Sequence, residues 1–541
     1  AGGDIEMDSR FSARAHRYFL LYWMAISMSK TIIIIGAGLA GLSAALQAAE
    51  NGCNVKLVSS FPSERAQSVM AEGGINAALN TKDENDSPEE HFTDTIKAAC
   101  GLADPNAVWG MTQAAPELVH WLLKLGVQFN MSGYDDVDLR NFGGQKKKRT
   151  AFAQSDTGKQ IMTAMIDAVR RKEASGMVER FRHHSFLTLR LCDNICCGCV
   201  IRDEYSQETV ELPGDAVIVA TGGMHGLFGN TTGSLSNTGE VTAELFRLGV
   251  PLANGEMIQY HPTTVKCGGK RMLISEAARG EGGRLFAMKD GKQWYFMEEK
   301  YPELGNLMPR DITAREIWKV SHESEVFLDM TEISDEIISN KLSGLADDCM
   351  TYLHKDIRKE PVSVLPGIHY FMGGILVDEQ HRTPIQNLYA AGECCAQYHG
   401  ANRLGGNSLL GALYGGRVAA KSACEQADVV DLSCATQIDF PPASQISEIK
   451  QLNKVMQETM GVVRNENTLL NGIQTVQALT GNLPLLGMAV LKSALARKES
   501  RGAHWREDYP KSNDDDYLKT TVARFDGKQI QISFVPVPER R

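Results

Sequence analysis

Residues 31–46, TIIIIGAGLAGLSAAL, restrict the fold of this chain more than any other stretch. The apolar run at 31–35 predicts a strand buried on both faces, as in the centre of a parallel sheet. Gly36, Gly38 and Gly41 follow in G-x-G-x-x-G spacing, and an Ala/Leu-rich helix begins among them. The first glycine permits a tight turn, the second lets backbone approach a pyrophosphate, and the third lets helix pack closely on strand. The stretch therefore predicts a dinucleotide-binding unit with the helix N-terminus facing the phosphates.

Length and charge narrow the class of protein. A chain of 541 residues is too long for one ordinary core, so we expect two or three domains. A formal net charge of −10 argues against nucleic acid as a main partner. No apolar run reaches the ~20 residues that a membrane span needs. Twelve cysteines without a regular framework suit a reducing compartment, so we expect a cytoplasmic protein with no membrane span of its own.

The first 27 residues resemble a leader. Arg10, Arg14 and Arg17 precede an apolar run at 18–26, as in a signal peptide, but no small-x-small cleavage site follows before the first strand. Met28 has the setting of a natural start. We therefore interpret residues 1–27 as a leader or an added extension.

The residues after the first helix favour a flavin over NAD. Residues 54–60, NVKLVSS, predict the second strand, which an NAD-binding fold usually ends with Asp or Glu. Ser59 and Ser60 stand there instead. Gly73 and Gly74 allow backbone to pass close to a ring system, although a simple turn would also explain them.

Two later apolar runs end in residues that could reach the same ligand. The run at 216–220 closes on the sequence TGG at 221–223, and the run from Leu388 closes on Gly392 and Glu393. Between them, residues 262–366 interrupt the nucleotide-binding pattern, which predicts a separate cap domain.

Three further segments have predictions of their own. Residues 186–219 predict a β-meander, and the cysteines at 196–199 lack a second pair that would complete a metal site, so we expect no metal. The lysines of the basic run at 146–149 predict a solvated face rather than a binding patch. The pattern from about 444 to 500 is helical, and residues 497–504, RKESRGAH, suggest the start of a polar tail.

Five short segments combine glycines with charged groups beyond structural need. Histidines and arginines gathered beside a flavin would form a positive pocket, and arginine binds carboxylates through paired, charge-assisted hydrogen bonds. Such a pocket suits a small dianion. The segments are QYHPT at 259–263, SEAARGEGG at 275–283, PRD at 309–311, HYFMGG at 369–374 and ANRL at 401–404.

Together with GANRLGGNSL at 400–409, these segments resemble the flavoprotein subunit of fumarate reductase and succinate dehydrogenase, a family that includes L-aspartate oxidase. The similarity runs from about residue 31 to the C-terminus. It implies an α/β fold: a Rossmann-like FAD-binding domain with an inserted α+β capping domain, a helical domain and a C-terminal segment. The expected ranges are 28–261 and 367–435 for the FAD-binding domain, 262–366 for the cap, 436–504 for the helical domain and 505–541 for the C-terminal segment.

The resemblance also implies roles for residues of the site. His261, Ser275, His369 and Arg403 would bind the substrate carboxylates, and Phe142 would pack against the substrate. Arg310 would be the proton donor, supplied through Glu276 and Arg279. FAD would contact Gly36, Ala37, Gly38, Gly41, Ser59, Ser68, Gly73, Gly74, Ala220, Thr221, Gly222, Glu240, Glu393, Ser408 and Leu409.

The chemistry of these groups is consistent with reduction of an alkene. Hydride from flavin N5 would add to one carbon while Arg310 protonates its neighbour. Arginine is a poor acid in water, because its pKa exceeds about 12. A closed, dry and positive pocket with a carboxylate relay could make it competent, so closure of the cap would be part of the mechanism.

Two departures from the family pattern affect the prediction. Many members tether the flavin through a histidine in an R-S-H-T-type segment, where this chain has RAQS at 65–68 and Gln67 at the tethering position. We therefore predict dissociable FAD, whose lower potential favours fumarate reduction. Ser275 stands where the family usually has threonine, so the carboxylate-binding hydroxyl is retained.

Fumarate reductase is thus the leading hypothesis, with succinate dehydrogenase next. L-aspartate oxidase is less favoured, because it usually has an acidic residue to hold the substrate amine and residues 139–153 contain none. A non-catalytic flavin-binding or assembly subunit is the alternative of another class. Without ferredoxin-like cysteine spacing, electrons would arrive from a separate iron–sulfur subunit or a soluble donor. Such partner subunits would supply any membrane association.

Overall fold

The computed structural model describes residues 29–133, 135–429, 438, 440 and 445–541, so the expected leader at 1–27 lies outside the described residues. A five-stranded parallel sheet in the order β20-β10-β1-β2-β6 forms the centre. Its first strand, β1, pairs with β2 and β10, and Ile32, Ile33 and Ile34 are fully buried. The prediction of a central parallel strand is confirmed. The strands are β1 (Thr31–Ile35), β2 (Asn54–Ser59), β6 (Val178–Arg182), β10 (Ala216–Val219) and β20 (Leu388–Ala390).

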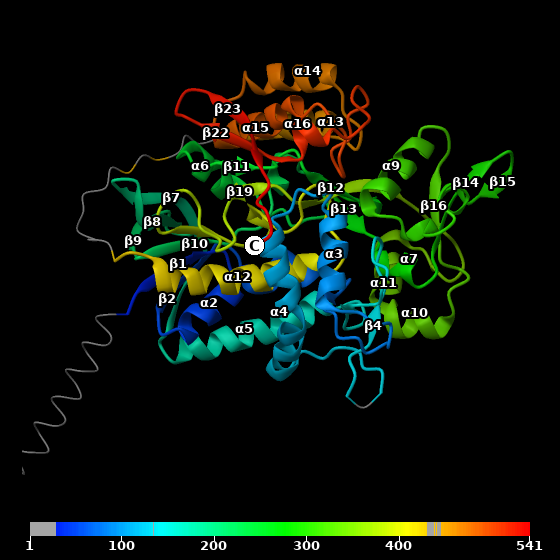
Figure 1. Ribbon diagram of the computed structural model, residues 1–541, viewed down its shortest axis with the longest axis horizontal. Helices are drawn as coiled ribbons and strands as arrows, with labels where there is room; N and C mark the ends of the chain where they lie inside the picture. Colours follow the sequence, from blue (N-terminus) through cyan, green and yellow to red (C-terminus); the bar gives the residue numbers. More distant parts are fainter. Residues whose placement is uncertain (1–28, 134, 430–437, 439, 441–444) are drawn as a thin grey trace, which may run out of the picture.

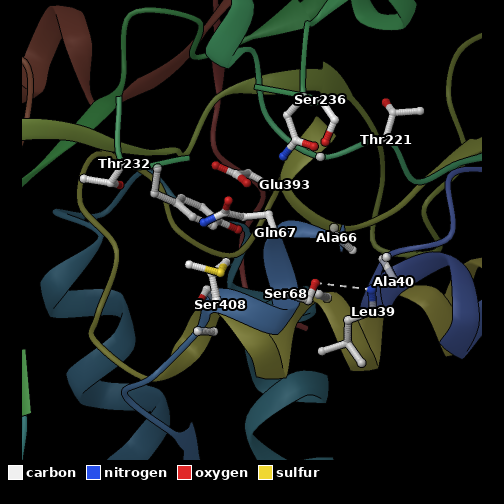
Figure 2. A pocket seen from close by; sticks show the side chains of 18 of the residues that line it. Leu39, Ala40, Ala66, Gln67, Ser68, Thr221, Thr232, Ser236, Glu393 and Ser408 are labelled. Atoms are coloured by element: carbon white, nitrogen blue, oxygen red, sulfur yellow. Dashed lines mark hydrogen bonds between the residues drawn. The ribbon is translucent and has the colours of Figure 1, made fainter. Parts of the chain in front are cut away.

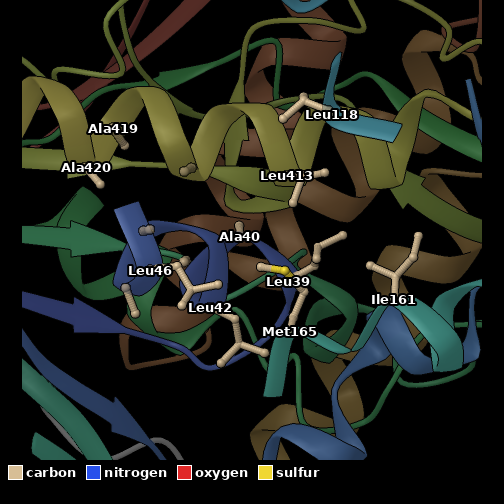
Figure 3. Close-up of a cluster of buried hydrophobic side chains, with 14 of the residues drawn as sticks. Leu39, Ala40, Leu42, Leu46, Leu118, Ile161, Met165, Leu413, Ala419 and Ala420 are labelled. Carbon is tan, nitrogen blue, oxygen red and sulfur yellow. The ribbon is translucent and has the colours of Figure 1, made fainter. Parts of the chain in front are cut away.

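Three helices cover one face of this sheet: α2 (Leu39–Glu50), α5 (Thr157–Ala174) and α12 (Asn407–Gln426). Figure 3 shows α12 lying along α2, with Leu413 near Ala40. Small residues make this approach possible, because a Cβ added to Gly416 would lie 2.3 Å from the backbone oxygen of Ala40. The predicted Ala/Leu-rich helix after β1, which is α2, therefore packs against both the parallel sheet and α12.

The antiparallel sheet β7-β8-β9 covers the other face, where Cys196 and Cys199 share a core with Ile33 and Val217. Its strands are β7 (His184–Cys192), β8 (Ile195–Asp203) and β9 (Thr209–Pro213), so the expected β-meander is present. Across the described part of the chain, no group of three or more His, Cys, Asp or Glu side chains could hold a metal ion.

A second, mixed sheet joins the end of the chain to the half that contains the parallel sheet. Its order is β21-β19-β11-β22-β23, formed by β21 (Cys395–Ala396), β19 (Gly374–Leu376), β11 (Leu252–Ala253), β22 (Lys519–Phe525) and β23 (Ile530–Pro536). Helices α6 (Glu240–Arg247), α13 (Ile446–Thr459), α14 (Glu466–Val476) and α15 (Asn482–Ala496) pack around one shared core beside it (Figure 1, top).

The prediction of a polar tail beginning at 497–504 is wrong. Arg497 is fully buried, and its guanidinium donates hydrogen bonds to Glu256 and Glu499, each at 2.7 Å. Arg501 binds Glu499 as well, at 2.8 Å. A guanidinium can be buried when carboxylates satisfy it, so this charged run forms part of the interior.

Residues 274–364 form the lobe at the right of Figure 1, with its own core around Leu285, Ile317 and Leu328. Its antiparallel sheet has the order β15-β14-β16-β17, and a three-stranded sheet, β13-β12-β18, leads into it. The boundaries expected at 261/262 and 366/367 fall inside β12 and β18, and the one at 435/436 lies outside the described residues. The lobe contains β14 (Arg284–Lys289), β15 (Lys292–Trp294), β16 (Val326–Asp329), β17 (Val362–Ser363), α7 (Glu276–Gly280), α8 (Phe296–Lys300), α9 (Arg310–Val320), α10 (Asp335–Lys341) and α11 (Ser343–Asp348), and the connecting strands are β12 (Ile258–Cys267), β13 (Lys270–Leu273) and β18 (Leu365–Phe371).

No helix in the described part of the chain combines the length and apolar character needed to cross a membrane. The remaining elements are α3 (Pro88–Ala98), α4 (Pro105–Leu125), α16 (Asp514–Tyr517), β3 (Ile75–Asn76), β4 (Leu139–Arg140), β5 (Thr150–Ala151), η1 (Ser63–Arg65), η2 (Gln67–Met70), η3 (His225–Leu227), η4 (Gly305–Leu307), η5 (Cys349–Leu353) and η6 (Gly392–Cys394).

The contact between α12 and α2 makes a stability prediction. Gly416→Ala places a methyl group against backbone that cannot retreat, so we expect a loss of about 1–3 kcal/mol in the free energy of unfolding, measured by thermal or denaturant unfolding. Gly461→Ala is the control, since its Cβ would meet its nearest atom at 3.6 Å. Equal stability of the two variants would contradict the close packing described here.

Candidate active site

A cavity of about 600 Å³ runs from the carboxyl ends of the central parallel strands to the lobe at 274–364. Ligands of open α/β sheets bind at this edge, where the strand order reverses. All but one of the residues predicted to contact FAD line it. They are Gly36, Ala37, Gly38, Ser59, Ser68, Gly73, Gly74, Ala220, Thr221, Gly222, Glu240, Glu393, Ser408 and Leu409.

Gly41, the exception, lies behind the turn. A Cβ there would stand 1.9 Å from the backbone oxygen of Gly36, so only glycine lets α2 pack this closely. Gly36 has a φ of +107°, and a Cβ on it would meet the backbone of Ala220 at 2.3 Å. These contacts fold the turn tightly against β10.

The start of α2 is open toward the cavity. Gly38 caps the helix without a side-chain hydrogen bond, so backbone N–H groups of the first turn remain available to a phosphate. The Leu39 N–H donates to Ser68 Oγ at 3.3 Å, drawn as a dashed line in Figure 2. Gln67 lines the same part of the cavity, and its Oε1 is buried without a hydrogen-bond partner. This cradle of open N–H groups and an unpartnered amide fits a bound dinucleotide.

At the other end of the cavity, Arg310 forms a charged row with Glu276 and Arg279. Arg310 starts α9, and its Nε and Nη2 donate to Glu276 Oε2 at 2.9 and 2.6 Å. Arg279 Nη2 donates to Glu276 Oε1 at 3.2 Å. Burial tends to raise the pKa of Glu276, but the two neighbouring guanidinium groups outweigh it and hold that pKa below its ordinary value. Glu276 is therefore ionised, while Arg279 lies behind it and does not line the cavity.

The two predicted histidines face each other across the pocket. The ring centroids of His261 and His369 are 5.1 Å apart, and both side chains line the cavity. Burial and the charge of Arg310 lower the pKa of both rings well below the ordinary value, so they are neutral. His369 Nδ1 is 2.8 Å from the Thr232 hydroxyl, whereas His261 Nε2 is buried without a partner.

The other predicted substrate residues lie in the same wall. Burial, with the charge of Arg310, lowers the pKa of Arg403 to about 9, and its guanidinium stacks over Tyr370. The Nε of Arg403 has no partner. Ser275 caps α7, and Phe142 is 2 % exposed. A Cβ on Gly73 would lie 2.8 Å from the Phe142 ring, which explains one glycine of the predicted pair.

The sequence reasoning missed a polar ring that joins Arg310 to Arg403. Gln259, fully buried, accepts from Arg310 Nη1 at 3.1 Å and donates to the Arg403 carbonyl oxygen at 2.8 Å. It also donates to Asn402, whose amide donates to Asp311 at 3.0 Å. Gln259 and Asn402 belong to the QYHPT and ANRL segments, but no sequence pattern distinguishes a buried amide from a surface one.

Glu72 is a second residue that was missed. It lines the cavity beside Ser275, and one of its carboxylate oxygens is buried without a partner. Burial, reinforced by the charge of Asp348, raises the pKa of Glu72 to about 8. The carboxyl group is therefore protonated at neutral pH, which adds a hydrogen-bond donor to a wall that already favours anions.

Comparisons with known proteins place this geometry in context. A family model described as FAD binding domain matches residues 31–409, and one described as fumarate reductase flavoprotein C-term matches residues 479–540. The succinate dehydrogenase flavoprotein subunit of Bacillus subtilis is 38% identical, over 94% of this chain and 98% of its own. The 8-methylmenaquinol:fumarate reductase flavoprotein subunit of Wolinella succinogenes is 32% identical, over 94% and 92%.

Solved structures agree with the sequence matches. The structure of E. coli quinol fumarate reductase FrdA superposes with a TM-score of 0.84 at 27% identity, covering 94% of this chain and 97% of that one. Sdh1 of Mycobacterium smegmatis gives a TM-score of 0.80 at 29% identity, with 95% of both chains covered. Among the sequence relatives, L-aspartate oxidase of Pyrococcus furiosus is 33% identical over 90% of this chain and 97% of its own.

The raised pKa of Glu72 predicts a pH-dependent stability difference. The unfolded carboxyl loses its proton near pH 4.5, but the folded one retains it to about pH 8, so the folded state loses relative stability as pH rises through this window. Glu72→Gln removes the titration while retaining shape. Between pH 5 and pH 8 we expect the unfolding free energy of the variant to rise relative to that of the wild type by up to a few kcal/mol, since one pKa unit is about 1.4 kcal/mol. Thermal unfolding of both proteins across this pH range measures the difference, because the thermal midpoint of the variant should rise relative to that of the wild type. A constant difference across this range would contradict the assignment.

Proposed function

The chain belongs to the succinate dehydrogenase/fumarate reductase flavoprotein family of FAD-dependent oxidoreductases, to which L-aspartate oxidase is also related, and we propose that it is the catalytic subunit of a fumarate reductase. The substrate would be fumarate and the product succinate. The observation that carries the proposal is the row of Arg310, Glu276 and Arg279 beside Arg403. These three guanidinium groups and one carboxylate leave two positive charges, which match the two carboxylates of the substrate.

The residues that hold the substrate surround that row. Arg403 and His369 would bind one carboxylate, and His261 with Ser275 the other. Because both histidines are neutral, they would act as hydrogen-bond donors, and the arginines would supply the charge complementarity. Phe142 would pack against the alkene and exclude water from it.

Arg310 would deliver the proton. Its guanidinium is held by Glu276 and Gln259, which fixes its orientation toward the cavity. After Arg310 donates its proton to the substrate, Glu276 and Arg279 would transfer another proton to Arg310. FAD, when bound, would supply the hydride for the neighbouring carbon, and the residues at the β1–α2 turn, the 65–74 segment and the start of α12 would hold it.

The flavin would be held without a covalent bond. Gln67 lies on the cavity wall at the place where many family members carry a tethering histidine, and an amide nitrogen lacks the nucleophilicity of an imidazole. A dissociable flavin of lower potential favours reduction of fumarate over oxidation of succinate.

Succinate dehydrogenase is the second candidate, favoured by the 38% identity to a protein of that name. L-aspartate oxidase is less favoured, because the segment that carries Phe142 offers no acidic side chain for an amine. For fumarate reduction and for succinate oxidation alike, we propose an iron–sulfur subunit as the electron-transfer partner. The protein would also associate with a membrane through that subunit.

Turnover assays test the proposed direction. With dithionite-reduced viologen as donor, purified protein should reduce fumarate faster than it oxidises succinate with an artificial oxidant. The reverse ratio would assign succinate dehydrogenase, and release of ammonia or peroxide from L-aspartate would assign the oxidase.

Substitution of the proton donor tests the mechanism in the same assay. Arg310→Gln removes the acid, and general acid catalysis contributes about 10²–10⁴-fold, so we expect kcat to fall by at least a hundredfold with FAD content unchanged. Arg315→Gln, on the same helix but stacked on Trp505, should retain near wild-type activity. An active Arg310→Gln enzyme would exclude this residue as the proton donor.

Acid precipitation tests the flavin attachment. Since nothing tethers the cofactor to Gln67, the yellow chromophore should remain in the supernatant after trichloroacetic acid treatment and migrate as FAD. Flavin that stays with the precipitated protein would show a covalent link at another residue. Such a protein would also give a fluorescent band on a denaturing gel.

A further inference from the structure

Two cysteines meet at the far side of the dinucleotide-binding half. Cys53 precedes β2, and Cys424 lies in the last turn of α12. They are 371 residues apart in sequence, yet their sulfur atoms are 2.8 Å apart. Neither lines the main cavity, although the opposite ends of β2 and α12 do, through Ser59 and Ser408.

The surroundings of this pair favour a thiolate at Cys53, whereas the hydrogen bond with Cys53 and burial raise the pKa of Cys424 and keep it a thiol. The hydrogen bond between the two sulfurs and the charge of Lys30 lower the pKa of Cys53, and they outweigh burial and the charge of Asp215, which raise it. The Lys30 ammonium group donates to the backbone oxygen of Cys424 at 2.8 Å, which fixes the positive charge beside the sulfurs. Cys53 is 6 % exposed and Cys424 half-buried, so a small oxidant can reach the pair from the Cys424 side.

Another cysteine shows the contrast. Cys100 is half-buried like Cys424, and burial raises the pKa of its thiol to about 12, whereas the pKa of Cys53 is lowered. Its Sγ makes hydrogen bonds to backbone groups of Ala98 and Gly502. Exposure alone therefore does not separate the Cys53–Cys424 pair from Cys100, whereas the adjacent second sulfur does.

We propose that Cys53 and Cys424 form a redox-sensitive dithiol that hydrogen peroxide converts into a disulfide tying β2 to α12. Peroxide oxidises the Cys53 thiolate to a sulfenic acid, and the peroxide oxygen not transferred leaves as water after protonation. The Cys424 thiol then attacks that sulfur, the S–S bond forms, and the sulfenic oxygen leaves as a second water molecule. The two sulfurs need to approach by less than ~1 Å to reach disulfide bonding distance.

The disulfide acts as a clasp on the dinucleotide-binding half. It closes a loop of several hundred residues, which restricts the unfolded chain and so stabilises the folded one. Since β2 and α12 both reach the cavity, the clasp strengthens the scaffold that retains an untethered cofactor. This proposal does not depend on the direction of the reaction.

The test uses the full-length holoenzyme. The protein is reduced, desalted, treated with hydrogen peroxide, alkylated with N-ethylmaleimide and digested for mass spectrometry. We expect one linked peptide containing Cys53 and Cys424, two hydrogens lighter than the sum of its parts, that disappears on treatment with dithiothreitol. Oxidation should also raise the thermal midpoint by a few degrees.

Single variants make the result specific. Cys53→Ser and Cys424→Ser should each abolish the linked peptide and the rise in midpoint, while Cys100→Ser should retain both. Full alkylation of Cys53 and Cys424 after peroxide, or oxidation of Cys100 before them, would overturn the proposed dithiol. A linked peptide without a change in midpoint would overturn the clasp.

Discussion

A carboxylate buried in protein must be paired, and the pairing of Glu276 is the interaction on which the rest of this site depends. Arg310 and Arg279 satisfy its two oxygens from one side, and the Gly143 N–H donates to it at 3.2 Å from the other. Gly143 and Gly405 leave the room it needs, because a Cβ on either would lie within 3 Å of the carboxylate. Glu276 therefore joins the lobe at 274–364 to the loops of the flavin-binding half.

The electrostatic character of the pocket follows from that arrangement. Guanidinium groups outnumber the ionised carboxylate in the charged row, and their field adds to burial in keeping His261 and His369 neutral. The same field and burial lower the pKa of Arg403 to about 9. An unpaired positive charge in a buried pocket is costly, so this charge distribution favours a compensating anion.

Residues remote from the cavity support the part of its wall that contains Arg403. The buried Arg497 pairs with Glu256 and Glu499, and Arg501 also pairs with Glu499, which fixes the turn at 502–503. The Ala503 N–H donates to the backbone oxygen of Ala401 at 2.9 Å, two residues before Arg403. A charged run near the end of the chain thus positions a loop about a hundred residues earlier.

The sequence by itself determined the central strand, the turn and the helix that follows, because a buried strand and three glycines at fixed spacing permit little else. It also identified the family and the charged segments, since residue type and local spacing carry that information; the domain boundaries and the role of each site residue stay predictions. Only the tertiary structure decided which polar residues are interior. Arg497, Gln259 and Glu72 have no local pattern that distinguishes them from surface residues, because burial of a polar group depends on partners distant in sequence. The meeting of Cys53 with Cys424 has the same physical origin: packing of α12 along the sheet, which no local sequence encodes.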